Sequence, residues 1–263
     1  MHTDTITSID EYISTLQPLI DNGCVAFRGQ CCASWSLEPG IIRKIKNTYE
    51  GIGESGLLFS LSVDNICALL EKARSNENID GSDCDLNILA ILQHYGAATP
   101  LLDFTYDALV ALYFACQPYY EEDQKETDGT VFCLNYPDQM RSTTSPMRPV
   151  ANPATIDIKD ALGPGHPGIW YWKTPDNLPC KRSEKQQSVF VFGWGLYWKY
   201  NTDRLIDGLT AIRLSADHKQ QMLAELNDRY GISELSLFPD LYGFAQANSH
   251  EKIMAHRVLV WVK

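Results

Sequence analysis

The sequence predicts an α+β fold in which a helical N-terminal half surrounds one early strand and a strand-rich half follows. Before residue 118, apolar residues mostly recur at helical spacing. From residue 129 onward they form short runs that are typical of strands. Helices and strands that segregate in this way favour α+β over an alternating wound sheet. No GxGxxG motif and no GxxxxGK[ST] motif occurs, so a dinucleotide-wound fold and a P-loop are not expected.

Amphipathic spacing and capping residues define the expected helices. They cover 8–16, 62–74, 85–96, 107–117 and 216–230. Ser8 and Glu11 have capping-box spacing, and Pro18 is expected to end or kink the first helix, which belongs to an N-terminal helical segment, 1–22. Gly96 and Gly231 are the expected C-terminal caps of two of these helices.

The expected strands are short and apolar. They begin at Cys24, in "CVAFRGQ", and continue with 129–136, 168–172, 188–194, 209–216 and 256–262. Residues 137–167 hold several prolines and few periodic apolar residues, so they are expected to form a long loop or insertion. "ELSLF", 234–238, is expected to be extended. All of this fits one domain over 1–263.

Composition limits the classes of function. The net charge of −11 gives no general electrostatic surface for nucleic acid or an anionic membrane, although a local basic pocket is compatible with it. No apolar run is long enough to span a membrane, and the N-terminus lacks the features of a secretory signal. We therefore expect a cytoplasmic protein with eight reduced cysteines. Their spacing and that of the histidines predict no metal site.

Several polar residues have both a structural and a functional interpretation. Arg28 ends an apolar strand, where it is either a solvated charge or the ligand of an anion. His94 near a helix C-terminus complements the helix dipole, and Asp103 or Thr105 caps the next helix, or else these residues line a pocket. Glu234 is either a solvated strand-end carboxylate or a catalytic one. Asp240 is expected to be a helix N-cap.

Four motifs in order resemble the FRG domain, a family of bacteria and phages named after Phe-Arg-Gly. They are "AFRGQ", "QHYGAATPLLDFTYDALVALYFAC", the spacing of Arg182, Gln186, Ser188 and Phe190, and "SLFPDLYG". The resemblance runs from about Cys24 to Gly243. The sequence departs from the family at Pro100, which stands where the family has an arginine, and at Ser188, where the family often has glycine.

The layout of the FRG domain is similar, more distantly, to ADP-ribosyltransferases of the Arg-Ser-Glu type. This resemblance implies a split two-sheet core, with Arg28, Ser188 and Glu234 as the catalytic set. It also implies NAD as substrate and a nucleic acid or protein as acceptor. The family's habitat implies a toxin or phage-defence effector, with an antitoxin or immunity protein as a possible partner.

The chemistry of NAD cleavage gives each candidate a role. Glu234 would stabilise the oxocarbenium-like ribose, and Arg28 would bind the diphosphate. Gly29 would let the backbone approach the nicotinamide amide, and Ser188 would position Glu234 or the ribose. Further candidate contacts to NAD are Phe27, His94, Tyr95 and Gln187.

Two alternatives stay open at this point. The first is a non-catalytic module of the same fold that binds a nucleotide or a partner, which Pro100 favours because it brings no charge. The second is a nuclease or hydrolase that uses His94, Asp103 and Glu234.

Overall fold

The computed structural model describes residues 5–49, 56–120, 125–135, 147–163, 168–193 and 209–248. Its strands are β1 (Cys24–Gln30), β2 (Leu102–Thr105), β3 (Gly129–Asn135), β4 (Met147–Pro149), β5 (Ile169–Lys173), β6 (Ser188–Phe192) and β7 (Thr210–Leu214). The helices of the N-terminal half are α1 (Ile9–Asp21), α2 (Gly40–Thr48), α3 (Gly56–Arg74), α4 (Asp85–His94) and α5 (Ala108–Ala115). The later helices are α6 (Ile158–Ala161), α7 (Lys181–Lys185), α10 (Lys219–Tyr230), α11 (Glu234–Leu237) and α12 (Leu241–Ala247), with short 3₁₀ turns at Pro153–Thr155 and Ala216–His218.

The strands form one mixed sheet in the order β4-β5-β6-β2-β1-β3-β7. Every pair is antiparallel except β4 with β5. The expected α+β class is confirmed. The expected division into two sheets is not, because the seven strands in the described residues are continuous through hydrogen bonds. The predicted closing strand, 256–262, lies outside the described residues.

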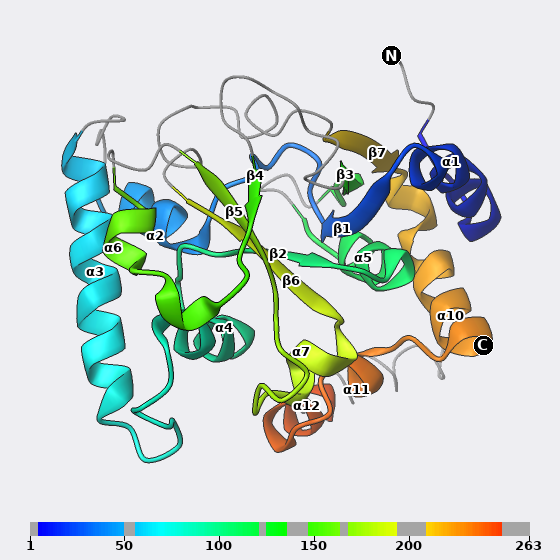
Figure 1. Ribbon diagram of the computed structural model, residues 1–263. Helices are drawn as coiled ribbons and strands as arrows, with labels where there is room; N and C mark the ends of the chain where they lie inside the picture. Colours follow the sequence, from blue (N-terminus) through cyan, green and yellow to red (C-terminus); the bar gives the residue numbers. More distant parts are fainter. Residues whose placement is uncertain are drawn as a thin grey trace.

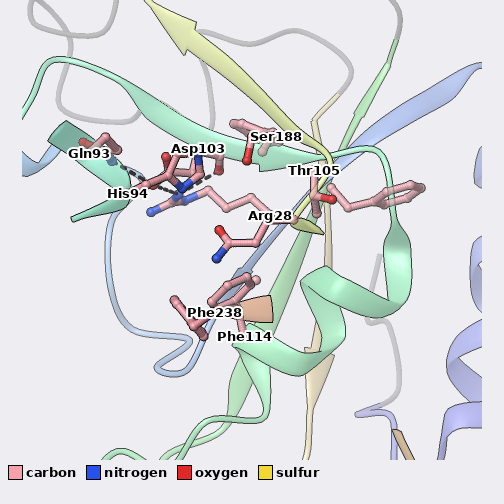
Figure 2. Close-up of a pocket in the computed structure, with 12 residues that line it drawn as sticks. Arg28, Gln93, His94, Asp103, Thr105, Phe114, Ser188 and Phe238 are labelled. Carbon is pink, nitrogen blue, oxygen red and sulfur yellow. Dashed lines mark hydrogen bonds and ion pairs between the residues drawn. The ribbon is translucent and has the colours of Figure 1, made fainter. Parts of the chain in front are cut away.

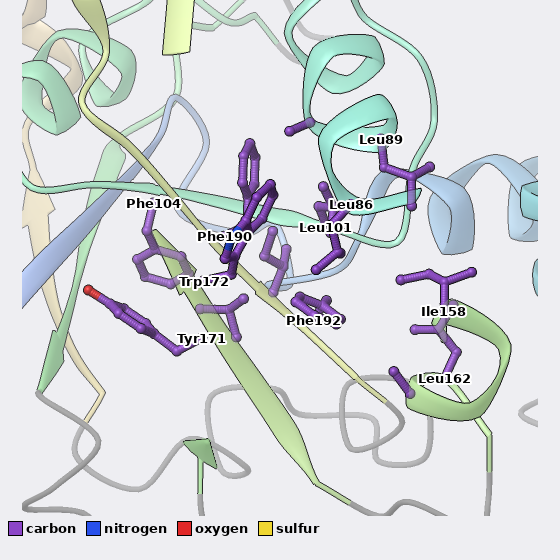
Figure 3. Close-up of a cluster of buried hydrophobic side chains, with 14 of the residues drawn as sticks. Leu86, Leu89, Leu101, Phe104, Ile158, Leu162, Tyr171, Trp172, Phe190 and Phe192 are labelled. Atoms are coloured by element: carbon purple, nitrogen blue, oxygen red, sulfur yellow. The ribbon is translucent and has the colours of Figure 1, made fainter. Parts of the chain in front are cut away.

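Two apolar cores lie on opposite faces of the sheet. In Figure 1, α2, α3, α4 and α6 lie to the left of the central strands, and α1, α5 and α10 lie to the right. Adjacent residues of β1 divide between the cores, since Ala26 packs with the α2–α4 side and Phe27 with the α5 side. Figure 3 shows the first core, in which Phe190 and Trp172 from the sheet lie with leucines of α4 and with Ile158 of α6.

Helix α5 lies unusually close to the sheet. A β-carbon on Gly29 would stand 1.9 Å from the carbonyl oxygen of Ala111, and one on Gly129 would stand 2.3 Å from that of Ala115. The two alanines are one helical turn apart, and the two glycines lie on the neighbouring strands β1 and β3. Close packing of this helix on the sheet therefore requires glycine at both strand positions.

Several local expectations are confirmed. Ser8 caps α1 by accepting from the backbone of Glu11, and Gly231 ends α10 in the left-handed conformation. Asp240 caps α12 by accepting from the backbone N–H of Gly243 at 2.9 Å. The expectation that Pro18 ends the first helix is, by contrast, wrong, because α1 continues to Asp21.

Other local expectations are wrong. Asp103 and Thr105 do not cap a helix, because 102–105 is the strand β2 and Asp107 is the cap of α5. The expected loop 137–167 contains β4, a 3₁₀ turn and α6 within its described part. Residues 234–237 form α11 rather than an extended segment, since the Ser233 and Ser236 side chains make a reciprocal capping box around its start.

Candidate functional site

A cleft of about 250 Å³ opens where β1, β2 and β6 meet the C-terminus of α4. It is lined by Phe27, Arg28, Gly29, Gln93, His94, Asp103, Phe104, Thr105, Phe114, Gln186, Ser188 and Phe238. Figure 2 shows Arg28 extending toward Gln93, His94 and Asp103, with Phe114 and Phe238 on the opposite wall. We call this the main cleft.

Arg28 is held at the centre of the main cleft. Its Nη1 donates to the backbone oxygen of Asp103 at 2.7 Å and lies 3.7 Å from the carboxylate Oδ2 of the same residue. Its Nε donates to Gln30 Oε1 at 3.3 Å. Burial lowers the pKa of Arg28, and Asp103 opposes this effect. The guanidinium nevertheless stays charged, because the ordinary pKa of arginine is so high. Arg28 is therefore a mostly buried cation and not a solvated strand end.

Asp103 is the carboxylate nearest to Arg28. Its Oδ2 accepts from Gln93 Nε2 at 2.7 Å, and the amide oxygen of Gln93 accepts in turn from the Thr99 hydroxyl. Its Oδ1 is buried and has no hydrogen-bond partner among the described residues. Gln93 thus orients the carboxylate by one oxygen and leaves the other oxygen unpaired.

His94 supplies a second unpaired group. Its Nε2 is buried without a hydrogen-bond partner among the described residues. Burial lowers the pKa of His94 below its ordinary value, and this outweighs the opposite effect of the Asp103 carboxylate. The imidazole is accordingly neutral at pH 7 and has the capacity to accept a proton.

The wall below Arg28 is built by residues that are distant in sequence. Arg182, of α7, makes a bidentate ion pair with Asp240, at the start of α12, and its Nη1 donates to the backbone oxygen of His94 at 2.6 Å. Its guanidinium also stacks over the ring of Tyr95, 4.7 Å from the centroid. Gln186 Nε2 donates to the backbone oxygen of Leu237 at 3.1 Å. These contacts fix Phe238 against the cleft.

The structure brings together some of the sequence-predicted residues and separates others. Phe27, Arg28, Gly29, His94 and Ser188 all line the main cleft. Gly29 is required primarily by helix α5, as its missing β-carbon shows.

Three predicted residues do not line the main cleft. Tyr95 packs its exposed ring on Arg182, and Gln187 lines a different cleft. Glu234 is the first residue of α11 and does not lie on a strand. It lies near Tyr113 of α5, since burial and then the negative charge of Glu234 raise the pKa of that phenol. The carboxylate that accompanies Arg28 and Ser188 is that of Asp103.

Sequence reasoning missed several lining residues. Phe114 lies in a helix that is apolar all round, so no pattern distinguished it from the core residues beside it. Phe238 and Gln186 belong to recognised motifs, but their place in the cleft depends on the ion pair of Arg182 with Asp240. Within the described residues, no group of three or more His, Cys, Asp or Glu side chains is placed to hold a metal ion. No described helix is both long enough and apolar enough to cross a membrane.

Comparison with known proteins finds one family model that matches part of the chain. Residues 23–124 match the family model of the FRG domain, which confirms the resemblance for this part of the chain. The matched region holds the first two motifs and contributes β1, β2 and α4 to the main cleft. The motifs around Arg182 and Asp240 lie beyond it. The curated proteins and the solved structures contain no match to the chain.

Proposed function

We propose, from the FRG domain over residues 23–124 and the side chains of the main cleft, that the protein is an NAD-dependent ADP-ribosyltransferase. One observation carries the proposal. A charged guanidinium (Arg28), a carboxylate with an unpaired oxygen (Asp103) and a serine (Ser188) share one cleft that has aromatic walls. Asp103 would take the role that the resemblance to ADP-ribosyltransferases implied for Glu234.

The chemistry requires a carboxylate at the ribose. The bond between C1′ of the ribose and N1 of the nicotinamide breaks, and its electron pair leaves with the nicotinamide. Positive charge then develops on the ribose, and the Asp103 carboxylate would stabilise it. The acceptor forms a new bond to C1′ and releases a proton, which the neutral His94 would accept at Nε2.

The remaining parts of NAD also find matching groups. The rings of Phe27, Phe114 and Phe238 offer faces on which nicotinamide can stack. Because about 250 Å³ lies at the lower end of ligand pockets, the cleft is expected to take only the nicotinamide–ribose end. The diphosphate would extend from Arg28 out of the cleft toward the exposed Arg43 of α2, whose charge is near enough to lower the pKa of Arg28.

Two matched variants test the assignment of the carboxylate. Asp103→Asn keeps an oxygen for Gln93 and removes the charge, so nicotinamide release from NAD should fall at least about 100-fold. Glu234→Gln removes a carboxylate that does not line the cleft, and it should retain release within about threefold. Nicotinamide is measured by chromatography, and circular dichroism checks that both variants fold.

The results test both the proposed activity and the choice between Asp103 and Glu234 as the catalytic carboxylate. A wild-type protein that releases no nicotinamide with nucleic acid or protein acceptors would refute the proposed activity. Loss of activity in Glu234→Gln together with a fully active Asp103→Asn would return the catalytic role to Glu234.

A second candidate is a binding module without turnover. It is favoured by the hydrogen bonds that Arg28 already makes to Asp103 and Gln30, and by Pro100 in place of the family's arginine. Calorimetry that detects NAD binding, with no nicotinamide released over hours, would support it.

A third candidate is a nuclease or hydrolase, which is favoured by the presence of both His94 and Asp103 in the main cleft. Activity that a chelator abolishes would support this candidate, because the transferase reaction needs no metal. A role as a toxin or phage-defence effector with an antitoxin partner stays a prediction from the family resemblance, and growth arrest on expression tests it.

A further inference from the structure

A second cleft adjoins the main cleft at Ser188. It has a volume of about 380 Å³ and is lined by residues of three segments, Tyr106 after β2, the end of β5 with the loop behind it, and α7 with Gln187. Ser188 lines both clefts, so the two share a boundary at the first residue of β6. We call the second one the side cleft.

Gln187 divides the two clefts by its backbone conformation. Its φ of 47° makes it the one residue other than glycine with a positive φ among the described parts of the chain. Residues with a β-carbon seldom adopt this conformation, and it is found preferentially at functional positions. Here it sends consecutive side chains into different spaces, with Gln186 in the main cleft and Gln187 in the side cleft.

The groups in the side cleft are neutral and suited to a flat, polar molecule. Tyr106 provides an aromatic wall, and its hydroxyl accepts from that of Tyr171 at 2.6 Å. The amide of Gln187 is exposed. Its Nε2 donates to Asp107 at 3.3 Å, and its oxygen accepts nothing from the described residues. An amide offers a donor and an acceptor in one plane, as the edge of a nucleobase does.

The charges at the rim do not select a cationic side chain as ligand. The carboxylate of Asp176 lies 3.9 Å from Lys173, and that of Glu184 lies 3.4 Å from Lys185. Each rim carboxylate thus has a lysine beside it, so an arginine of a protein acceptor would find no unbalanced carboxylate. Lys173 is well exposed and remains close enough to the rim to meet a phosphate.

We propose that the side cleft is the acceptor site of the transfer and that it takes a nucleobase. This rests on the function proposed above. The ribose C1′ in the main cleft and a base nitrogen in the side cleft would meet near Ser188. The nitrogen forms the new bond to C1′, the nicotinamide leaves with the electron pair of the broken bond, and the proton of the nitrogen passes to His94.

The first test measures binding without NAD. Labelled single-stranded DNA and RNA of about 12 nucleotides are titrated with the full chain by fluorescence anisotropy. Free nucleosides and mononucleotides compete in parallel, which separates a site for a base within a strand from a site for a free nucleotide. Gln187→Gly keeps the backbone conformation and removes the amide, whereas Gln187→Asn keeps an amide in a residue that tolerates positive φ.

We expect Gln187→Gly to weaken binding at least about tenfold and Gln187→Asn to stay within about threefold of the wild type. Lys173→Gln should weaken binding of the oligonucleotide and leave binding of the nucleoside unchanged, because only the oligonucleotide carries neighbouring phosphates. Absence of binding by all these probes would overturn the proposal. So would binding that Gln187→Gly does not change.

The second test measures transfer. With NAD present, the ratio of labelled oligonucleotide to released nicotinamide should fall at least about tenfold in Gln187→Gly. Labelling of protein but not of nucleic acid would overturn the nucleobase site. If the wild type binds oligonucleotide and releases no nicotinamide, the proposed reaction fails while the nucleobase site stands, so the two failures are distinguishable.

Discussion

The backbone of β1 at Gly29 packs directly against the backbone of α5, and this contact fixes the position of the neighbouring Arg28. The hypothetical β-carbon that would stand 1.9 Å from the Ala111 carbonyl meets backbone, which cannot rotate away as a side chain can. The glycine of the Phe-Arg-Gly motif therefore serves the packing of α5, and the arginine before it serves the cleft.

Gly29→Ala tests this division at the level of a single residue. Because α5 would have to move, the free energy of unfolding should fall by at least about 3 kcal/mol, measured by urea denaturation. Gly40→Ala is the matched control, since its β-carbon would meet nothing closer than 3.6 Å. That change should leave stability unaltered or raise it by about 0.5 kcal/mol. Equal stability of the two variants would show that α5 is not held by this contact.

Two elements, α7 and α12, are joined by the ion pair of Arg182 with Asp240. Arg182 is 5% exposed and Asp240 17%, and the guanidinium also binds the last carbonyl of α4. In Figure 1, α7, α11 and α12 lie together below the central strands. The pair thus holds the segment that carries Phe238 in place beside the cleft.

Asp240→Asn should destabilise the protein by about 3 kcal/mol at pH 7, because it leaves a buried guanidinium without its counter-ion. Asparagine caps helices as well as aspartate does, so the change isolates the charge from the cap at Gly243. Urea denaturation measures the loss. A loss below about 1 kcal/mol would mean that solvent screens the pair.

The same pair predicts a pH dependence. The hydrogen bond from Arg182 lowers the pKa of Asp240 to about 2, below the ordinary value for a carboxyl group. Its contribution is fully present above the unfolded-state pKa, about 4, and is lost as the pH falls toward the folded-state value. The difference in stability between wild type and Asp240→Asn should therefore be constant above about pH 5 and shrink between about pH 4 and pH 2. A difference that persists unchanged below that range would contradict the assignment.

At the scale of the elements, the sequence predicts helix ends better than it predicts the type of short segments. Caps such as Ser8, Gly231 and Asp240 act within a few residues, so local patterns located them correctly. Residues 234–238 alternate as a strand would, yet the capping box of Ser233 and Ser236 makes a helix. Glu234 was therefore expected on an extended segment, whereas it is the first residue of α11. Of the two interpretations of Asp103, the helix cap is wrong, and the residue lines the main cleft. No strand was expected there, because four residues, 102–105, are too few to show alternation.

In the whole molecule, the matched family region does not form a separate folding unit. Within the sheet, β1 lies between β2 and β3, and β2 lies between β1 and β6. The partners β3 and β6 come after residue 124, where the match to the FRG domain ends. The sequence could not predict this order, because the pairing of β2 with β6 joins residues that are distant in the chain. No local sequence pattern distinguishes one sheet of seven strands from two sheets, so the expectation of two sheets could not be corrected from the sequence.

A fragment of residues 23–124 is therefore expected not to fold. Each of its two strands would lose one hydrogen-bonded neighbour, and the apolar cores would lose the side chains of β3, β5 and β6. Circular dichroism should show no cooperative thermal transition, whereas the full chain of 263 residues should show one. A fragment with a sharp transition and dispersed amide resonances would show that the matched region is autonomous.

The contact of α5 with β1 and β3 also bears on the kinetics of ligand capture. The backbone of β1 at the main cleft is fixed because it packs directly against the backbone of α5. The opposite wall carries Phe238 beside Phe114 of α5, and the segment of Phe238 is held by a single ion pair and a few hydrogen bonds. A ligand that is too large for the resting cleft can then enter only by displacing the Phe238 side. Association should consequently become faster in Asp240→Asn, and dissociation should become faster still.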